Sequence, residues 1–211
     1  MKTEIVKVDT ERVELDKFDL IKSVLIKDGV LAYPTDTFYG LGVNCFSEDA
    51  IRKVYMLKKR DISKPLSVII ADLSELEELV EDIPPIFKSL SSEFWPGLLT
   101  LVFRASEKLP EMLIGHSRSI GVRYPDYDWL RALVRYAGFP ITATSANRSN
   151  RGEASDPFYV VEDFFGKINL IVDGGQTPGL QPSTVIDIST GTVKILREGA
   201  LPVSLFEKYL G

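Results

Sequence analysis

Two hydrophobic periods alternate along the chain, which predicts helices and strands interleaved over its whole length. The apolar residues of 16–27 and 127–137 recur every three or four positions, as on one face of an amphipathic helix. Short continuous apolar runs lie between such segments, and 30–33 and 66–71 are strong strand candidates. With no internal repeat or linker, residues 1–211 are predicted to form one α/β domain, a twisted open sheet with helices on its faces.

Local signals refine two of these elements. Ser74 and Glu77 have the spacing of a capping box, which predicts the start of a short helix over 75–80. Near the end of the chain, the runs 185–188 and 193–196 flank a Ser-Thr-Gly turn and predict a β-hairpin. A hairpin brings antiparallel pairing, so a mixed sheet is expected rather than an all-parallel one.

The segment 31–42, LAYPTDTFYGLG, stands out because its polar residues follow a buried strand directly. Pro34 has no N–H to donate to a neighbouring strand, so the strand is expected to end there. Small oxygen-bearing residues and two glycines then allow the backbone to approach a ligand closely. We interpret the segment as one wall of a ligand site; a polar loop after an edge strand is the alternative.

Other predicted strands also end in polar side chains. Strand ends gathered at one edge of an α/β sheet commonly form ligand sites. Hydroxyl, amide and guanidinium groups suit carboxylate and polyphosphate ligands, which arginine can bind through two parallel hydrogen bonds. The pattern therefore predicts an enzyme or binding protein for a nucleotide and a small acid. The residues are Thr35, Thr37, Arg123, Ser145, Asn147, Ser183, Thr184 and Arg197.

Charge is distributed unevenly along an acidic chain. The net charge of −5 and the pI near 5.1 oppose general coating of nucleic acid. Basic residues nevertheless cluster at 58–64, at Arg118 with Arg123, and at Arg148 with Arg151. These clusters favour an anionic ligand in a pocket, with solvated helix ends as the alternative.

The scarcity of cysteine and histidine excludes several kinds of chemistry. Cys45 and His116 are each the only residue of their type, which rules out an intramolecular disulfide and opposes a zinc site or Cys/His catalysis. We expect a small buried residue at Cys45 and a loop residue at His116. There is no signal peptide and no apolar run of membrane-spanning length, so a cytoplasmic protein without membrane contact is expected.

A series of short strings, taken in order over residues 17–200, resembles the YrdC/TsaC family of threonylcarbamoyl-AMP synthases. The strings are PTDTFYGLG, KKRxxxKPL, PGLLTLV, SIGVR, TSAN, DGG, PSTVID and LREG. The resemblance implies the YrdC-like fold, a twisted open α/β sheet with a concave, positively charged face. It also implies synthesis of threonylcarbamoyl-AMP and pyrophosphate from L-threonine, bicarbonate and ATP, the first step toward N6-threonylcarbamoyladenosine (t6A) in tRNA.

The implied chemistry needs no covalent catalyst. The threonine amine captures CO₂ or bicarbonate as a carbamate, and the carbamate attacks the α-phosphorus of ATP. Positioning and charge neutralisation dominate transfer at phosphorus. Mg²⁺ is expected because ATP is the substrate. The partners implied are downstream threonylcarbamoyl transferase proteins, with tRNA or double-stranded RNA as a further possibility.

The resemblance also assigns roles to individual residues. Thr37, Arg123 and Ser183 are expected to hold threonine, with Arg123 on its carboxylate. Lys58 and Arg60 are expected to be catalytic and to face the triphosphate. The residues expected to bind ATP are Lys58, Arg60, Lys64, Ser119, Ser145, Asn147, Ser155 and Arg197.

Plainer roles remain open for several of these positions. Arg123 could form a surface ion pair, and Ser145 with Asn147 could cap a turn. Thr35 and Asp36 are expected mainly to shape the turn after the strand, and Tyr39 either packs or closes over the substrate.

Two departures from the family pattern matter. Residues 149–153 form a slightly longer loop than the usual Ser-Gly continuation, which changes how Ser155 would reach ATP. The chain ends soon after 197–199, so it resembles the single-domain type without the extra C-terminal domain of long members.

Two rival functions remain open. A YciO-like paralogue of weaker or different activity is opposed by retention of Lys58, Arg60 and Lys64. A module that binds double-stranded RNA or tRNA is opposed by the acidic balance and the absence of an aromatic stacking motif.

Overall fold

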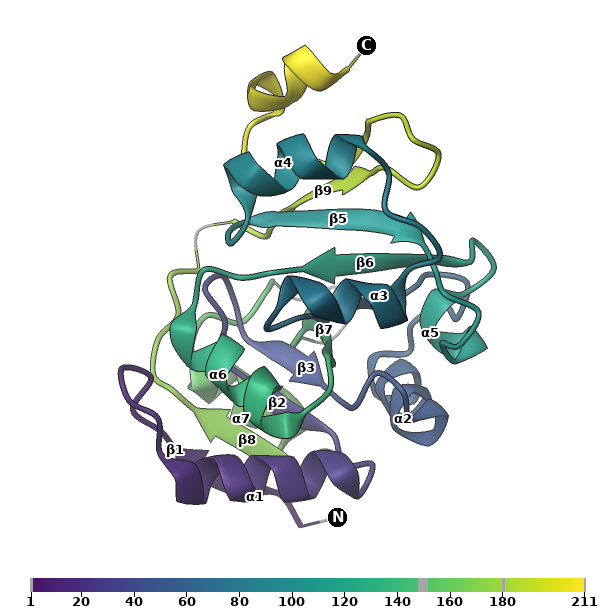
Figure 1. Ribbon diagram of the computed structural model, residues 1–211. Helices are drawn as coiled ribbons and strands as arrows, with labels where there is room; N and C mark the ends of the chain where they lie inside the picture. Colours follow the sequence, from purple (N-terminus) through teal and green to yellow (C-terminus); the bar gives the residue numbers. More distant parts are fainter. Residues whose placement is uncertain (1, 148–151, 180, 211) are drawn as a thin grey trace.

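A ten-stranded mixed sheet runs through the computed structural model, which describes residues 2–147, 152–179 and 181–210 (Figure 1). Its strand order is β1-β8-β2-β3-β7-β4-β6-β5-β9-β10, with both parallel and antiparallel neighbours. The predicted mixed sheet is therefore confirmed. The strands are β1 (Glu4–Lys7), β2 (Leu31–Tyr33), β3 (Gly40–Gly42), β4 (Ser67–Ile69), β5 (Leu99–Arg104), β6 (Ser119–Arg123), β7 (Ile141–Ser145), β8 (Leu170–Asp173), β9 (Thr184–Asp187) and β10 (Lys194–Arg197).

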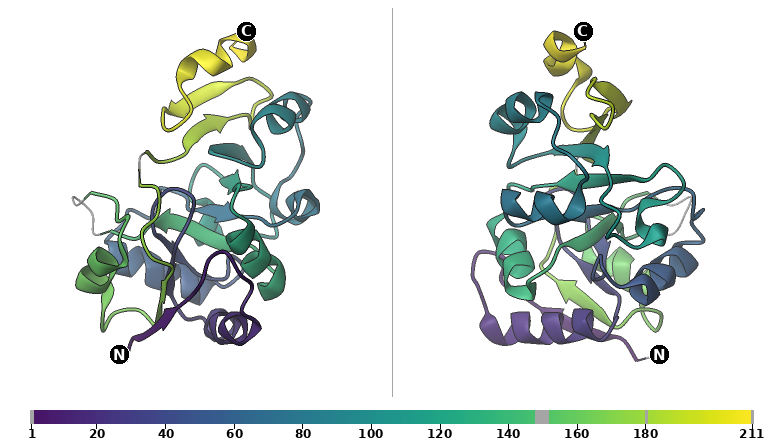
Figure 2. Two further views of the ribbon diagram at one scale, coloured as in Figure 1. Left: turned by 90° about the vertical axis from the view of Figure 1, so that its left-hand side faces the viewer. Right: turned by 45° about the vertical axis from the view of Figure 1, so that its right-hand side comes forward.

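Helices cover both faces of this twisted sheet. Figure 2 shows β1 with α1 at one end of the molecule and η2 at the other. In the described residues, no helix combines the length and apolar character needed to cross a membrane. The helices are α1 (Leu15–Ile26), α2 (Glu48–Lys58), α3 (Leu76–Leu79), α4 (Ile86–Phe94), α5 (Glu111–Ile114), α6 (Asp128–Ala137) and α7 (Pro157–Phe164), with 3₁₀ turns η1 (Leu73–Glu75) and η2 (Val203–Tyr209).

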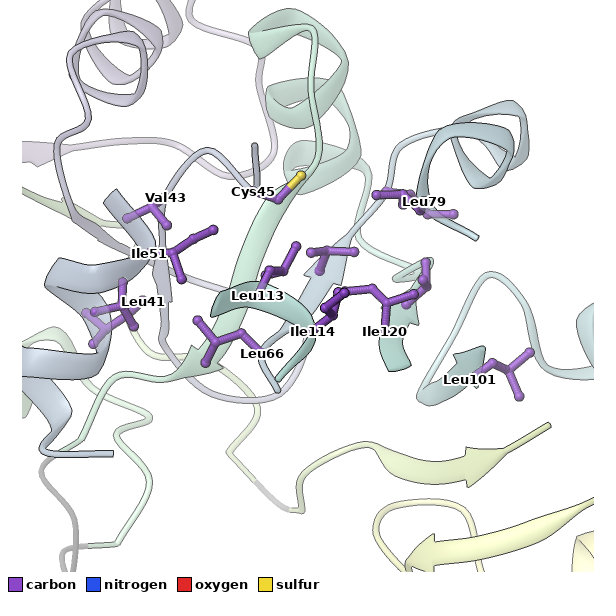
Figure 3. Packing of buried hydrophobic residues seen from close by; sticks show 14 of the residues in the cluster. Leu41, Val43, Cys45, Ile51, Leu66, Leu79, Leu101, Leu113, Ile114 and Ile120 are labelled. Carbon is purple, nitrogen blue, oxygen red and sulfur yellow. The ribbon is translucent and has the colours of Figure 1, made fainter. Parts of the chain in front are cut away.

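The apolar core forms two clusters, one on each face of the sheet, and successive side chains of β2 point into them alternately. Leu31 and Tyr33 belong to the cluster that α1 and α6 cover, which includes Trp129 of α6. Ala32, which points the other way, belongs to the larger cluster with residues of α2, α4, α5 and α7. Figure 3 shows part of this larger cluster around Cys45, which is fully buried as predicted. Burial raises the pKa of the Cys45 thiol.

The two glycines of the segment 31–42 lie in a strand. Gly40–Gly42 is strand β3, which pairs antiparallel with β2. The glycines are needed because the ring of Tyr33 covers them: a Cβ on Gly42 would lie 2.6 Å from Tyr33 Cε1. The Tyr33 hydroxyl donates to the Thr142 carbonyl at 2.9 Å, which fixes the ring in this place. The Tyr33 ring thus packs directly against the backbone of Gly40 and Gly42.

The capping box predicted at Ser74 and Glu77 is wrong. Asp72 accepts a hydrogen bond from the Ser74 N–H at 2.9 Å, and Glu75 accepts one from the Ala71 N–H at 3.1 Å. The caps therefore begin the 3₁₀ turn η1, two residues earlier than predicted, and α3 is only a short continuation of it. The hairpin near the end of the chain is confirmed, because β9 and β10 pair antiparallel.

Candidate functional site

A cavity of about 940 Å³ opens over one face of the sheet. Its walls come from the β2–β3 hairpin, the loop after α2, and strands β4, β5, β6, β7, β9 and β10. The predicted site residues that line it are Thr37, Arg60, Lys64, Arg123, Ser145, Ser183 and Arg197.

Cross-strand register places the polar side chains of this cavity in one row. Arg123 at the end of β6 pairs with Thr100 on β5, and Thr100 pairs with Val185 on β9. Val185 pairs in turn with Arg197 on β10. Directly paired residues project from the same face of a sheet, so Arg123, Thr100 and Arg197 all face the cavity.

Arg123 is the most deeply buried cation of the row. Its Nη2 donates to Asp36 Oδ2 at 2.9 Å, Nη1 to Thr37 Oγ1 at 3.3 Å, and Nε to the Gly97 carbonyl at 3.4 Å. The side chains of Arg123 and Asp36 are only 7% and 13% exposed, so the ion pair is buried and not on the surface. Burial lowers the pKa of Arg123 and raises the pKa of Asp36, although each charge favours the other.

The hydroxyl of Thr37 is oriented by its neighbours. Thr35 Oγ1 donates to the Phe38 carbonyl at 2.7 Å, because a carbonyl can only accept. The 3.0 Å bond between Thr35 Oγ1 and Thr37 Oγ1 is therefore donated by Thr37. With its proton used and Arg123 donating to it, the Thr37 oxygen offers a ligand only an acceptor site. Thr35 shapes the turn, as expected from the sequence, whereas Asp36 is the counter-ion of the buried arginine.

Ser183 lies between Thr100 and Arg197. Its hydroxyl is 2.8 Å from Thr100 Oγ1, and both side chains are buried. Arg197 Nη2 donates to the Ser183 carbonyl at 2.8 Å and to Ser183 Oγ at 3.4 Å. Thr100 was missed from the sequence because it lies near the start of a strand, β5. In an antiparallel pair the start of one strand meets the end of its neighbour, so strand ends alone identify only part of the row.

Lys58 is buried and is not among the residues that line the cavity. Its Nζ donates to the Ser145 carbonyl, to the Asn147 carbonyl at 3.1 Å and to Asn147 Oδ1 at 3.2 Å. Burial, together with the nearby charge of Arg60, lowers the pKa of Lys58 to about 8. Its ammonium holds the end of β7, and the expectation that Lys58 faces the triphosphate stays a prediction. Ser145 Oγ also donates to Asn147 Oδ1 at 2.7 Å, as in the capped turn considered above.

Arg60 and Lys64 lie on the loop at the mouth of the cavity. Arg60 donates from Nε to the Lys64 carbonyl at 3.1 Å and from Nη2 to the Pro65 carbonyl at 2.9 Å. The Tyr55 hydroxyl also donates to the Lys64 carbonyl, at 2.8 Å. These bonds fix the loop backbone, while the Lys64 side chain is exposed beside the cavity.

Three predicted nucleotide contacts lie one layer outside the lining: Asn147, Ser119 and Ser155. Ser119 Oγ lies 2.8 Å from Ser117 Oγ, and Ser117 lines the cavity. The Ser155 carbonyl accepts from the Thr177 N–H at 2.8 Å.

Three remaining predictions concern the surroundings of the site. Tyr39 is fully buried and its hydroxyl donates to the Gly175 carbonyl at 2.7 Å, and it is also among the residues that line the cavity. His116 lies in an exposed turn, as expected. The predicted basic pair Arg148 and Arg151 and most of the loop 149–153 lie outside the described residues.

The cavity is cationic in an acidic protein. Its lining residues include the cations Arg60, Lys64, Arg123 and Arg197, but one carboxylate, Glu153, in the described part of the chain. Glu153 was missed because a glutamate in a polar loop carries no sequence signal. Among residues 2–147, 152–179 and 181–210, no three Asp, Glu, His or Cys side chains come together as a metal site would require. The cavity therefore suits anionic ligands.

Known proteins resemble this chain over most of its length. A family model for Sua5, YciO and YrdC, described as telomere recombination, matches residues 23–199. A Pyrococcus abyssi protein named threonylcarbamoyl-AMP synthase is 37% identical over 201 residues, which cover 95% of this chain and 59% of that protein. This chain thus spans a little over half the length of that relative.

Two solved structures share the fold. P. abyssi Sua5 complexed with L-threonine gives a TM-score of 0.91 at 36% identity, covering 100% of this chain and 61% of that one. Escherichia coli YciO gives a TM-score of 0.86 at 25% identity, covering 98% of this chain and 100% of that one. The fold is common to both, and the sequence is closer to Sua5.

Proposed function

Because the chain belongs to the Sua5/YciO/YrdC family, we propose that it makes L-threonylcarbamoyl-AMP and pyrophosphate from L-threonine, bicarbonate and ATP. The observation that carries this proposal is the convergence of Thr37, Arg123 and Ser183 in one cationic cavity. The relative of known structure with L-threonine bound has the same fold, at 36% identity.

In the proposed threonine subsite, Arg123 binds the carboxylate. Its hydrogen bonds to described residues use one N–H on each of Nε, Nη1 and Nη2. Each terminal nitrogen carries two N–H groups, so one on Nη1 and one on Nη2 remain for the two carboxylate oxygens. The Thr37 oxygen beside them accepts a hydrogen bond from the same ligand.

In the proposed nucleotide subsite, Arg60, Lys64 and Arg197 neutralise the phosphates. A carbamate oxygen attacks the α-phosphorus, and the bond from that phosphorus to the pyrophosphate oxygen breaks, as in a nucleotidyltransferase. Negative charge accumulates on the leaving pyrophosphate, and preorganised cations stabilise it. Lys58 acts as a positioning residue, since it fixes Ser145 and Asn147 at the end of β7.

Mg²⁺ enters this proposal with the substrate. The cavity lining offers one carboxylate, Glu153, among the described residues, which is fewer than a protein-built site needs. A magnesium ion that keeps most of its waters and binds the triphosphate fits this lining.

The product determines the partners. A carbamoyl-phosphate anhydride is labile in water, so its consumer is a threonylcarbamoyl transferase that completes t6A on tRNA. We place this step in the cytoplasm. Direct binding of tRNA or double-stranded RNA is a separate possibility that the cationic cavity favours only weakly on an acidic protein.

One assay tests the activity. The protein is incubated with Mg²⁺, ATP, L-threonine and labelled bicarbonate, and pyrophosphate and a labelled adenylate are measured. Product that depends on threonine supports the synthase, and no such product would refute it. A YciO-like role, which the match over the whole length of YciO keeps open, predicts weak or threonine-independent turnover. Salt-sensitive RNA binding without turnover favours the RNA-binding module.

A further inference from the structure

Glu153 is the one acidic side chain among the cavity-lining residues that the structure describes. The next residue fixes its position, because the Ala154 carbonyl accepts from the Tyr39 N–H at 2.8 Å. That bond ties the segment of Glu153 to the β2–β3 hairpin. Glu153 is thus held at the cavity wall by the same hairpin that carries Thr37.

The charges facing Glu153 connect it to the proposed threonine subsite. They are Arg197 from β10 and Lys58 from α2. Arg197 is hydrogen-bonded to Ser183, whose hydroxyl contacts Thr100, the cross-strand neighbour of Arg123. Glu153 and Arg123 therefore line the same cavity, and the charge of Arg197 acts on both of them.

A carboxylate is out of place in a cavity for anions unless it meets a cation. ATP, bicarbonate and the threonine carboxylate are all negative, and Glu153 repels each of them. The α-ammonium of threonine is the one cationic group that the proposed substrates bring besides the magnesium of the nucleotide. Opposite charge at close range favours the binding of that ammonium beside Glu153.

We propose that Glu153 binds the α-ammonium of threonine and accepts the proton that this nitrogen loses as the carbamate forms. The proposal rests on the proposed function. Of the three ammonium protons, one stays on nitrogen, one leaves with the bicarbonate hydroxyl as water, and one moves to Glu153. A nitrogen–carbon bond forms, the carbon–hydroxyl bond breaks, and ammonium, bicarbonate and carboxylate give carbamate, water and the protonated carboxyl.

The surroundings of Glu153 suit a base. Burial raises its pKa, while Arg197 and Lys58 oppose that rise and favour the carboxylate form. A carboxylate whose pKa is raised toward the operating pH is a more effective proton acceptor than an exposed one. Burial and the two cations thus shift the pKa of Glu153 in opposite directions.

The test compares Glu153→Gln with wild type over pH, with Glu78→Gln on the exposed surface of α3 as the matched control. Glu153→Gln should lower kcat/KM for threonine about 10²–10⁴-fold near pH 7, the contribution of a general base. The deficit should shrink about tenfold per pH unit as the free amine of threonine increases. Glu153→Asp should recover part of the rate. A rate unchanged at pH 7, or a deficit equal at every pH, overturns the proposal, because a role in holding Arg197 would give a loss independent of pH.

A binding measurement separates this proposal from the proposed function. By calorimetry without ATP, Glu153→Gln should bind L-threonine on the order of tenfold to a hundredfold more weakly than wild type. It should bind 3-hydroxybutyrate, which lacks the amine, equally well. Equal weakening for both ligands, or none for threonine, contradicts the ammonium contact. Wild type that binds threonine in this selective way but gives no product refutes the synthase and leaves the Glu153 contact supported.

Discussion

Asp36 Oδ2 lies 2.9 Å from Arg123 Nη2, and the other carboxylate oxygen, Oδ1, is buried without a hydrogen-bond partner among the described residues. Burial shifts the pKa of both groups toward the neutral form, which means that removal from water costs more than their mutual attraction returns. Such a pair does little for stability as a whole, but each charge depends on the other. The ion pair holds the Arg123 guanidinium in one orientation at the cavity floor.

Removing one member of this pair should therefore destabilise the protein. Asp36→Ala leaves Arg123 buried and uncompensated, and should lower the free energy of unfolding by about 3–5 kcal/mol. Urea denaturation measures the loss. The double variant Asp36→Ala with Arg123→Met should recover most of it, since no buried charge remains. Equal losses in the single and double variants would show that the pair is not coupled.

Arg123→Ala should raise the threonine concentration needed for half-saturation while leaving ATP binding largely intact. A charge-assisted hydrogen bond contributes about 1.5–3 kcal/mol, so an increase of about tenfold or more in the Kd for threonine is expected. Arg123→Lys should restore little of it, because an ammonium cannot make two parallel bonds to a carboxylate. Calorimetry with each ligand checks this, and equal loss of both affinities would show the assignment to be wrong.

Thr100→Val keeps the shape of a buried side chain but removes the hydroxyl that contacts Ser183 at 2.8 Å. Losing that neutral hydrogen bond should cost about 1 kcal/mol, or roughly fivefold in threonine affinity, with little effect on ATP. Thr192→Val, in an exposed turn, is the matched control. If both variants bind threonine like wild type, Thr100 does not orient Ser183 for the ligand.

Stability should depend on Lys58 in the window between pH 8 and 10.5. Its pKa falls from 10.5 to about 8 on folding, so above pH 8 the unfolded chain binds a proton that the folded protein lacks. The contribution of Lys58 to the free energy of unfolding should therefore rise with pH across the window, by at most about 3 kcal/mol. Burial raises the pKa of Cys45, Tyr33 and Tyr39, which lowers stability toward high pH, so the Lys58 contribution is taken as the difference between wild type and variant. Lys58→Met should abolish this rise, whereas Lys88→Met on the exposed surface of α4 should keep it. A pH profile of chemical denaturation that is the same in Lys58→Met and wild type would contradict the buried ammonium.

Gly42→Ala should distort the β2–β3 hairpin, because its Cβ would lie 2.6 Å from the Tyr33 ring. Overpacking of this kind typically costs about 1–3 kcal/mol, measurable as a lower Tm. Gly152→Ala is the matched control, because no atom of the residues that the structure describes lies within 4 Å of a Cβ at that position. A Gly42→Ala protein as stable as the control would show that the ring moves aside freely.

The sequence correctly predicted those features that depend only on the local pattern of residues. Strands over 30–33 and 66–71, the terminal hairpin and the buried Cys45 all follow from apolar patterning and turn chemistry. The convergence of Thr37, Arg123 and Ser183 was also predicted, from polar strand ends and from the family resemblance, and all three line one cavity.

The remaining features depend on pairings that the sequence does not display. Thr100 lies in the site because it pairs with Arg123 on the neighbouring strand. The local sequence pattern does not predict the order of β5, β6 and β9 in the sheet. Lys58 lies in a basic cluster, but its side chain is buried and donates to Asn147, whereas Lys64 is exposed at the cavity. Proximity in the sequence therefore did not distinguish the two lysines.

The row that joins Arg123, Thr100 and Val185 also ties chemistry to correct folding. Strand side chains alternate faces, so a slip of β5 by one residue would replace Thr100 with Leu99 or Leu101 and turn its hydroxyl toward the opposite layer. A misregistered sheet could still bury enough apolar surface to be compact, but it would place a leucine opposite a buried guanidinium. The native register of β5 is therefore required to form the cavity, and the proposed binding of threonine should be lost when β5 slips.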